Sequence, residues 1–284
     1  MTTLTDLHQS TRRRFAAANL DTPDLDARLL LEHFTGTTRL DLVREPGRIM
    51  TPAQTAELEK AVARRLAGEP VHRILGWREF YGLRLALSPD TLEPRPDTEA
   101  LVDLVLAHAR ATVARKGSCS ILDLGTGTGA IALAMLSALP QARALGVDIS
   151  EGALATARAN ATANRLADRF ETVLSDWFER ISGRFDVILS NPPYISGGEL
   201  AGLARDVTRF DPPRALSGGA DGLDAYRTIA SGAAPHLDPD GLIGVEIGSR
   251  QKEDVAAIFR EAGFSPAGEA KDLGGRDRAL LFTL

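Results

Sequence analysis

Cysteine and long apolar runs are both scarce in this sequence of 284 residues. The single cysteine, Cys119, excludes an intramolecular disulfide and a cysteine-rich zinc site. The longest apolar run, roughly residues 130–139, is far shorter than the ~20 residues that cross a bilayer. Residues 1–6, MTTLTD, also lack the apolar segment of a signal peptide. We therefore expect a cytoplasmic protein with no membrane partner.

Positive charge is scarce as well. Lysine and arginine total 33 against 38 acidic residues, which gives a formal net charge of −5. Proteins that bind a nucleic-acid backbone usually present a strongly basic surface, so we expect no direct binding to nucleic acid. Hydrophobic residues make up 44% and charged residues 25%, as in ordinary globular proteins, and the length allows one large domain or two unequal ones.

Helix signals fill the first part of the chain. Thr51-Pro52-Ala53-Gln54 is a capping box with proline at the first helical position, and apolar residues follow it at helical spacing. Thr22-Pro23-Asp24 starts another helix in the same way. No cluster of catalytic residue types lies here. We interpret residues 1–72 as a small helical domain that helps to dock a partner.

The periodicity changes after this domain. Residues 73–87 alternate between apolar and polar side chains, with glycines at turn positions, which predicts a β-hairpin in a linker over residues 73–92. A new helix is expected to begin at Asp97 or Thr98, because either side chain can cap it. The second domain is therefore expected over residues 93–284.

Strands and helices alternate through this second domain. Apolar segments predict strands near residues 120–124, 143–149, 171–174, 185–189, 241–248 and 279–282, separated by helical patterns. Such alternation predicts an α/β fold with a doubly wound, mostly parallel sheet. The last strands are joined by a short connection, so we expect an antiparallel edge.

A glycine-rich segment joins the first of these strands to its helix: Gly125, Thr126, Gly127, Thr128 and Gly129. Glycine lets the backbone approach a ligand closely, and a helix N-terminus favours an anionic group. The segment is typical of a loop that holds a nucleoside-bearing cofactor.

Residues at the ends of the next two strands fit the same cofactor. Asp148 follows the glycine loop by about 20 positions and can accept hydrogen bonds from both ribose hydroxyls. Trp177 is placed to stack on an adenine ring, and Asp176 can accept from its exocyclic amine. We therefore expect these residues to bind the cofactor.

The segment Asn191-Pro192-Pro193-Tyr194 follows the apolar run 185–189 almost directly. Its prolines cannot continue a sheet ladder and hold the chain extended. An amide, backbone carbonyls and an aromatic ring are thus expected at the carboxyl end of a strand. Ligands of open α/β sheets bind at that end.

Taken together, these residues resemble the release-factor glutamine methyltransferases, S-adenosylmethionine-dependent enzymes with a Rossmann-like sheet. Flanking segments narrow the resemblance to this family: residues 76–82, 94–99, 175–177, 218–223, 226–227 and 275–278. The resemblance implies a class I methyltransferase sheet, S-adenosylmethionine as cofactor and S-adenosylhomocysteine as product. It also implies methylation of N5 of the glutamine in the Gly-Gly-Gln motif of peptide-chain release factors. The chain departs mildly from the family's usual pattern at Glu93, Asp97 and residues 210–212.

The chemistry assigns roles to the four residues of the Asn-Pro-Pro-Tyr segment. An amide nitrogen is a poor nucleophile, so its site should offer hydrogen-bond acceptors. We expect the Asn191 side-chain oxygen and the Pro192 carbonyl to accept the two N–H bonds, Pro193 to fix the loop and Tyr194 to pack on the amide. Asn191 is also expected to lie at the cofactor, and no metal is needed.

Four other functions stay open on the sequence alone. A ribosomal-protein glutamine methyltransferase or an N6-adenine DNA methyltransferase would use the same chemistry. Gly125, Gly127 and Ala130 also satisfy the G-x-G-x-x-A pattern of dinucleotide binders, which keeps a nicotinamide dehydrogenase in play. A catalytically silent binding module is the fourth.

Overall fold

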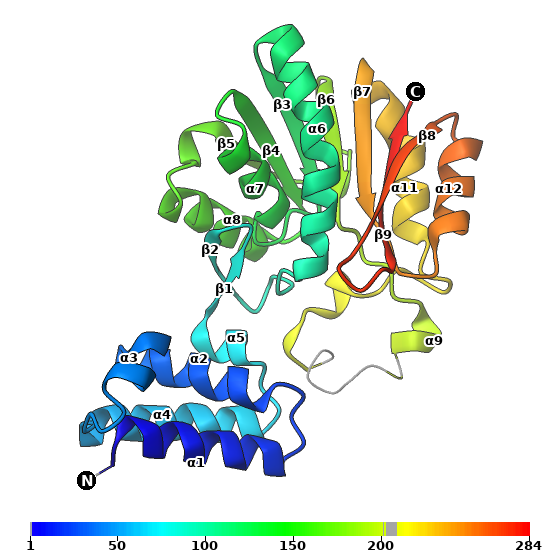
Figure 1. The fold of residues 1–284 in the computed structure, drawn as a ribbon. Coiled ribbons are helices and arrows are strands. Elements are labelled where there is room, and N and C mark those ends of the chain that lie inside the picture. The colour runs from blue at the N-terminus through cyan, green and yellow to red at the C-terminus, as the bar shows by residue number, and fades with distance from the viewer. Residues whose placement is uncertain (1, 201, 203–208) are drawn as a thin grey trace. The chain divides into compact units, whose positions relative to one another are not determined.

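In the computed structural model, which describes residues 2–200, 202 and 209–284, the chain divides into two units, Met1–Gly76 and Trp77–Leu284 (Figure 1). The division falls at Gly76, whose φ of +76° ends a helix in the left-handed conformation that glycine adopts readily. In these described ranges, no helix has the length and apolar character to span a membrane.

The first unit consists of helices α1 (Leu4–Ala17), α2 (Pro23–Thr35), α3 (Arg39–Arg44), α4 (Pro52–Leu66) and α5 (Val71–Leu75). Thr51 caps α4 as the sequence predicts: its hydroxyl accepts from the Gln54 N–H, and the Gln54 side chain accepts from the Thr51 N–H. Phe15, Leu31 and Leu58, from α1, α2 and α4, are fully buried. The predicted helical fold of this unit is confirmed.

A β-hairpin opens the second unit, with strands β1 (Trp77–Phe80) and β2 (Leu83–Ala86). Tyr81 and Gly82 make its turn with φ of +50° and +74°, and positive φ at both central positions suits the twist of a two-residue hairpin. The predicted hairpin is confirmed, but its predicted start at residue 73 is wrong. Ile74 and Leu75 lie in α5, where Pro70 precedes the first turn and both side chains are buried together.

The remaining elements of the second unit are α6 (Glu99–Lys116), β3 (Cys119–Leu124), α7 (Ala130–Ala138), β4 (Ala142–Asp148), α8 (Glu151–Ala163), β5 (Phe170–Leu174), β6 (Phe185–Ser190), α9 (Gly197–Leu200), α11 (Asp224–Ala233), β7 (Leu237–Glu246), α12 (Lys252–Glu261), β8 (Ser265–Lys271) and β9 (Asp277–Thr283). Short 3₁₀ turns lie at Pro96–Thr98, Ala167–Arg169, Pro213–Ala215 and Ala234–His236.

Strands β3 to β9 of the described residues form a seven-stranded sheet in the order β5-β4-β3-β6-β7-β9-β8. β3 to β7 run parallel to one another, and β9 runs antiparallel to β7 and β8. The predicted α/β class, with a mostly parallel sheet and an antiparallel edge, is therefore confirmed. β8 lacks an apolar pattern, because most of its side chains are exposed, and the sequence did not predict it as a separate strand.

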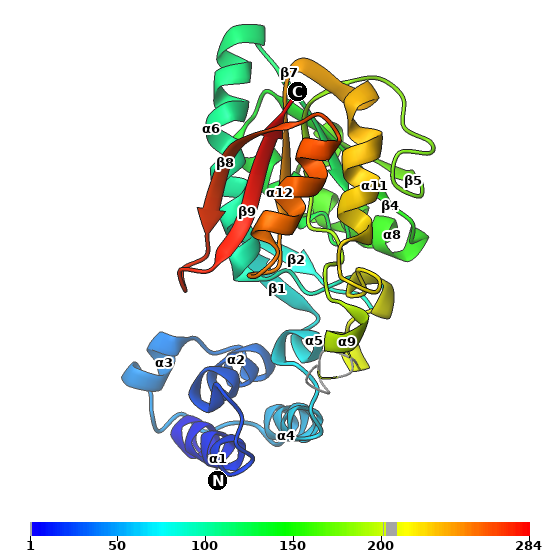
Figure 2. The ribbon, with the colours of Figure 1, turned by 90° about the vertical axis from the view of Figure 1, so that its right-hand side faces the viewer.

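Helices cover both faces of this sheet (Figure 2). On one face α6, α7 and α8 form a core that includes Leu101, Leu133 and Ala157. On the other face α11 and α12 contribute Tyr226 and Phe259 to a second core. Burial on both faces explains why the parallel strands are nearly continuous apolar runs.

Cys119 begins β3 beside Ala142 of β4 and is 1% exposed. Burial raises the pKa of its thiol to about 12. The single cysteine is therefore an enclosed, protonated thiol at the start of β3.

The start of α6 differs from the expectation. Thr98 occupies the capping position, but its φ is helical and its side chain makes no cap hydrogen bond, because a 3₁₀ turn runs directly into the helix. Its hydroxyl donates instead to Glu246 Oε2 at 2.6 Å. Asp97 lies 3.3 Å from an Arg278 nitrogen. The predicted side-chain cap at Asp97 or Thr98 is thus wrong.

The strand order reverses between β3 and β6, which are parallel neighbours with Leu124 in register with Ser190. Gly125 and Asn191 therefore leave the sheet side by side at the carboxyl ends of these strands. Ligand crevices of open α/β sheets lie at such a switch point.

Candidate active site

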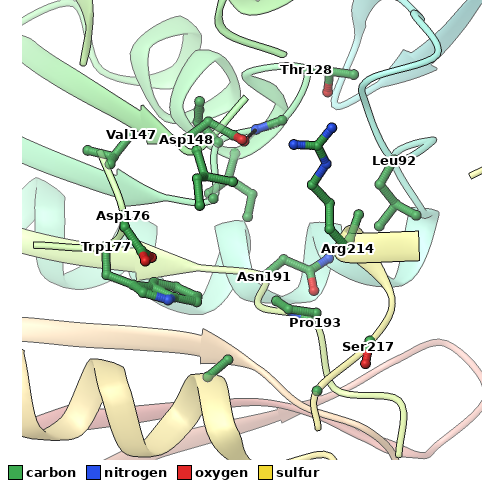
Figure 3. A pocket seen from close by; sticks show the side chains of 18 of the residues that line it. Leu92, Thr128, Val147, Asp148, Asp176, Trp177, Asn191, Pro193, Arg214 and Ser217 are labelled. Carbon is green, nitrogen blue, oxygen red and sulfur yellow. Dashed lines mark hydrogen bonds between the residues drawn. The ribbon is translucent and has the colours of Figure 1, made fainter. Parts of the chain in front are cut away.

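A cavity of about 540 Å³ lies at this switch point (Figure 3). Its volume falls within the ~300–1,000 Å³ range of small-molecule sites. Its lining brings together most of the predicted site residues: Gly125, Thr126, Gly127, Thr128, Asp148, Asp176, Trp177, Asn191 and Pro193. Gly129, Pro192 and Tyr194 are absent from the lining that the described residues form.

The glycine loop is held by hydrogen bonds to strands β3 and β4. Thr126 donates its backbone N–H to the Val147 carbonyl at 2.8 Å and its hydroxyl to Asp123 Oδ2 at 2.7 Å. Gly125 has a φ of +70°, and an added Cβ there would meet nothing within 4 Å. Gly129 plays a packing role, because a Cβ on it would lie 3.1 Å from the Leu133 side chain.

Asp148 connects the second strand to the loop. Its Oδ2 accepts from the Gly127 N–H and its Oδ1 from the Ser150 N–H, both at 2.9 Å. Burial raises the pKa of this carboxyl. Each oxygen keeps a further lone pair that can accept from a bound ligand.

Asp176 and Trp177 follow β5 and line the cavity on the same side as Asp148, across from Arg214 (Figure 3). Trp177 has a φ of +45°, a conformation that non-glycine residues rarely adopt. A bulky residue held in this region is a sign of local strain, which gathers at ligand sites.

Asn191 lies where β6 ends, and its side-chain Nδ2 is 3.3 Å from the Thr98 hydroxyl. That hydroxyl is the group that donates to Glu246. Tyr194 turns away from the cavity lining, and its hydroxyl lies 3.4 Å from Glu246 Oε1. Burial raises the pKa of Tyr194 to about 12, so its hydroxyl stays protonated.

The loop that carries Asn191 is braced from behind by the glycine-rich segment 218–223. Gln251 donates through Nε2 to the carbonyls of Tyr194 (3.0 Å) and Gly222 (3.2 Å), and its Oε1 accepts from the Gly248 N–H. A Cβ on Gly222 would lie 2.5 Å from the Tyr194 carbonyl oxygen. Glycine is therefore required there by close approach of the two backbones.

The cavity is acidic. Asp90, Asp148, Asp176 and Asp224 contribute carboxyl groups, whereas Arg214 contributes the single basic side chain among the described lining residues. Arg214 Nη2 lies 4.0 Å from Asp90 Oδ1. Such a lining favours a ligand with a net positive charge over a dianionic pyrophosphate.

Sequence reasoning missed part of this lining. Asp90, Leu92 and Arg214 all line the cavity but carry no motif of their own. Arg214 follows two prolines in a polar loop, and the segment 94–99 that resembles the family begins just after Leu92. The polar loop around Arg214 and the segment 94–99 were therefore the sequence signals that could have pointed to these lining residues.

We also searched the described residues for side chains that could bind a metal ion. Within the residues that the structure describes, no group of three or more His, Cys, Asp or Glu side chains is arranged to hold a metal ion.

Comparison with known proteins gives matches along nearly the whole chain. The PrmC N-terminal domain model matches residues 6–76, and the methyltransferase small domain model matches residues 102–208. The release factor glutamine methyltransferase of Agrobacterium fabrum is 53% identical over 95% of this chain and 94% of its own. The enzyme of the same name from Rhodospirillum rubrum is 45% identical over 94% of this chain and 81% of its own.

Among solved structures, the catalytic domain of hMettl16 in complex with MAT2A 3'UTR hairpin 6 has a TM-score of 0.55. It is 15% identical in sequence and covers 84% of this chain and 85% of its own. At this identity the likeness shows a shared methyltransferase fold.

Proposed function

The chain belongs to the release factor glutamine methyltransferases, and we propose that it methylates N5 of the glutamine in the Gly-Gly-Gln motif of peptide-chain release factors. One observation supports this proposal above others. Asn191, which can hold a planar amide, lines the same cavity as the glycine loop, which can hold a cofactor. Donor and acceptor of the methyl group would therefore share one enclosed space.

The lining fits S-adenosylmethionine. The cofactor carries a sulfonium, an ammonium and one carboxylate, so its net charge is positive, as the acidic lining favours. Asp148 has free lone pairs for two ribose hydroxyls, and Trp177 presents a ring beside the Asp176 carboxylate. The open side of Gly125 leaves room for the methionine part. These residues are the ones that we propose to hold the cofactor.

When bound, S-adenosylmethionine supplies an electrophilic methyl group, so that the N–C bond forms as the S–C bond breaks, S-adenosylhomocysteine is released and one amide proton passes to water. The protein's part is orientation and charge stabilisation. We propose that the Asn191 oxygen and the Pro192 carbonyl accept the two amide N–H groups, which stabilises positive charge developing on nitrogen. Pro193 keeps the loop extended. Tyr194, which the sequence predicts to pack on the amide, is absent from the described lining and has its hydroxyl near Glu246, so we propose that it supports the loop instead.

The first unit is the part that we propose to help dock the release factor, because the cavity residues all lie in the second unit. Translation takes place in the cytoplasm, which is therefore the proposed compartment. We propose no direct contact with nucleic acid, given the net charge of −5.

The decisive test is methyl transfer from labelled S-adenosylmethionine to purified release factor, with the modified peptide mapped by mass spectrometry. Label on the Gly-Gly-Gln glutamine with wild type, lost with Asn191→Ala while S-adenosylhomocysteine still binds, is the expected result. Label on a ribosomal protein or on DNA, and none on the release factor, would overturn the substrate assignment. A titration with NAD serves as the control for cofactor class.

A further inference from the structure

Glu246 is a buried carboxyl with no place in the mechanism above. It ends β7, is 1% exposed and is absent from the described cavity lining. Its predecessor Val245 is in register with Ser190, so Glu246 and Asn191 leave the sheet at the same level. Buried carboxyls need hydrogen-bond partners, and those of Glu246 lead toward the cavity.

Two hydrogen bonds connect Glu246 to Asn191. The Thr98 hydroxyl donates to Glu246 Oε2 at 2.6 Å, and Asn191 Nδ2 lies 3.3 Å from the same hydroxyl oxygen. A hydroxyl has a single hydrogen. Once that hydrogen is given to the carboxylate, the oxygen can only accept, and the NH₂ end of Asn191 must face Thr98. The Asn191 oxygen is then the end left for a substrate.

We propose that Glu246 is a positioning residue for methyl transfer: through Thr98 it turns Asn191 so that its amide oxygen faces the substrate nitrogen. This inference rests on the proposed function. The two ends of an asparagine amide have nearly the same shape, so packing alone distinguishes them poorly. With the amide reversed, an NH₂ group would face the NH₂ group of the substrate. Because the carboxylate fixes the hydrogen-bond direction, it excludes the reversed orientation of the Asn191 amide before substrate binds.

The protonation state of Glu246 decides whether the direction is fixed. Burial raises its pKa to about 7, whereas the Thr98 hydroxyl, the Arg278 charge and the Tyr194 hydroxyl oppose the rise, and the Asp97 charge adds to it. Tyr226 also faces Glu246, but its hydroxyl donates to the backbone carbonyl. In the ionised form Glu246 can only accept from Thr98. In the protonated form it can donate, and Thr98 is then free to donate to the Asn191 oxygen.

Kinetics with a release factor tests the connection through a pair of matched changes. Glu246→Met keeps the length but removes the acceptor, and Thr98→Val keeps the shape but removes the hydroxyl. Each should lower kcat about tenfold or more, with KM and the Kd for S-adenosylhomocysteine within about threefold of wild type. Because both changes break one chain of bonds, the double variant should lose no more than the worse single variant. A double variant whose loss of kcat equals the product of the two single losses would overturn the proposal. So would a single variant with the kcat of wild type.

Conservative substitutions at the same two positions should restore kcat. Thr98→Ser keeps the hydroxyl, and Glu246→Gln keeps one acceptor oxygen, so both should recover most of the kcat lost in Thr98→Val and Glu246→Met. The kcat of wild type should also rise between pH 6 and pH 8, and that rise should disappear in Glu246→Gln. A Thr98→Ser variant as impaired as Thr98→Val would show that packing, not the hydroxyl, matters.

A measurement without turnover separates this inference from the proposed function. With isotope-labelled asparagine, the side-chain NH₂ signals of Asn191 are identified by their loss in Asn191→Ala. Their exchange with solvent should be at least about tenfold slower in wild type than in Thr98→Val. Equal exchange would overturn the positioning role even if release factor is methylated. Slow exchange with no methylation of release factor would overturn the proposed substrate alone.

Discussion

At the scale of single residues, Asp148 has two tasks: it accepts from the glycine loop and faces the cavity. Asp148→Asn keeps one acceptor and places an NH₂ group against a backbone N–H. We expect the Kd for S-adenosylhomocysteine to rise roughly 10–100-fold, since the NH₂ group also takes away the acceptor of one ribose hydroxyl, at about 1–3 kcal/mol. Calorimetric titration measures the change. The exposed Asp168→Asn is the control and should bind as wild type does.

Asp123 gives the protein a pH-dependent stability. Its carboxyl is 1% exposed, its Oδ1 has no hydrogen-bond partner among the described residues, and burial raises its pKa from 3.8 to about 7. The folded state thus binds this proton more tightly than the unfolded state does. The contribution of Asp123 to the free energy of unfolding is full below about pH 4 and falls as pH rises to about 7.

Asp123→Asn should remove that dependence. Relative to wild type, the variant should gain free energy of unfolding between pH 4 and pH 7, by roughly 1–4 kcal/mol, and the difference should stay level above pH 7. Urea unfolding of both proteins across this range is the measurement. A difference that does not change with pH would contradict the raised pKa.

At the scale of elements, the segment 218–223 and the Asn191 loop depend on each other's backbones. Gly222→Ala should lower kcat at least about tenfold, because its Cβ would displace the Tyr194 carbonyl. Gly183→Ala is a matched control: its φ of +86° imposes similar backbone strain, but nothing lies within 4 Å of the added Cβ. The left-handed backbone should cost each variant about 1–2 kcal/mol of stability. The overlap with Tyr194 adds to the loss in Gly222→Ala, and only that variant should lose activity. Equal kcat in the two variants would contradict the brace.

Elements with local signals were predictable from the sequence. The glycine loop, Asp148, Trp177 and Asn191 each lie at the end of a strand or within a few residues after it, and parallel strands bring their carboxyl ends to one edge. The Thr98–Glu246 bond was not predictable, because its partners are 148 positions apart and Thr98 resembles an ordinary helix cap. The side-chain partner depends on the packing of α6 against β7, which no local pattern encodes.

The three departures from the family's usual pattern share a feature that only the structure reveals. Each is an acidic residue paired with an arginine: Glu93 with Arg78, Asp97 with Arg278 at 3.3 Å, and Asp211 with Arg95 at 3.2 Å. Glu93 and Asp211 are almost fully buried, where an ion pair offsets part of the cost of removing a carboxylate from water.

At the scale of the whole molecule, the two units should respond differently to a ligand. All the residues that line the described cavity lie in Trp77–Leu284, so we expect S-adenosylhomocysteine to bind and stabilise that unit. At a ligand concentration of 100 times Kd the gain is about 2.7 kcal/mol, which corresponds to roughly 5–10 °C in Tm for a domain of this size. Scanning calorimetry should show one transition that moves and one that does not. A single transition that moves as a whole would show that the units unfold together.

The enclosed thiol of Cys119 gives the molecule its own reporter of core opening. A thiol reagent can reach this sulfur only when the core around the start of β3 opens, and the chain has no second cysteine to add background. The rate of labelling therefore measures how often this part of the core opens, without any added probe. Because β3 leads directly into the glycine loop, a bound cofactor should slow that rate, and its slowing would report occupancy of the cavity from inside the core.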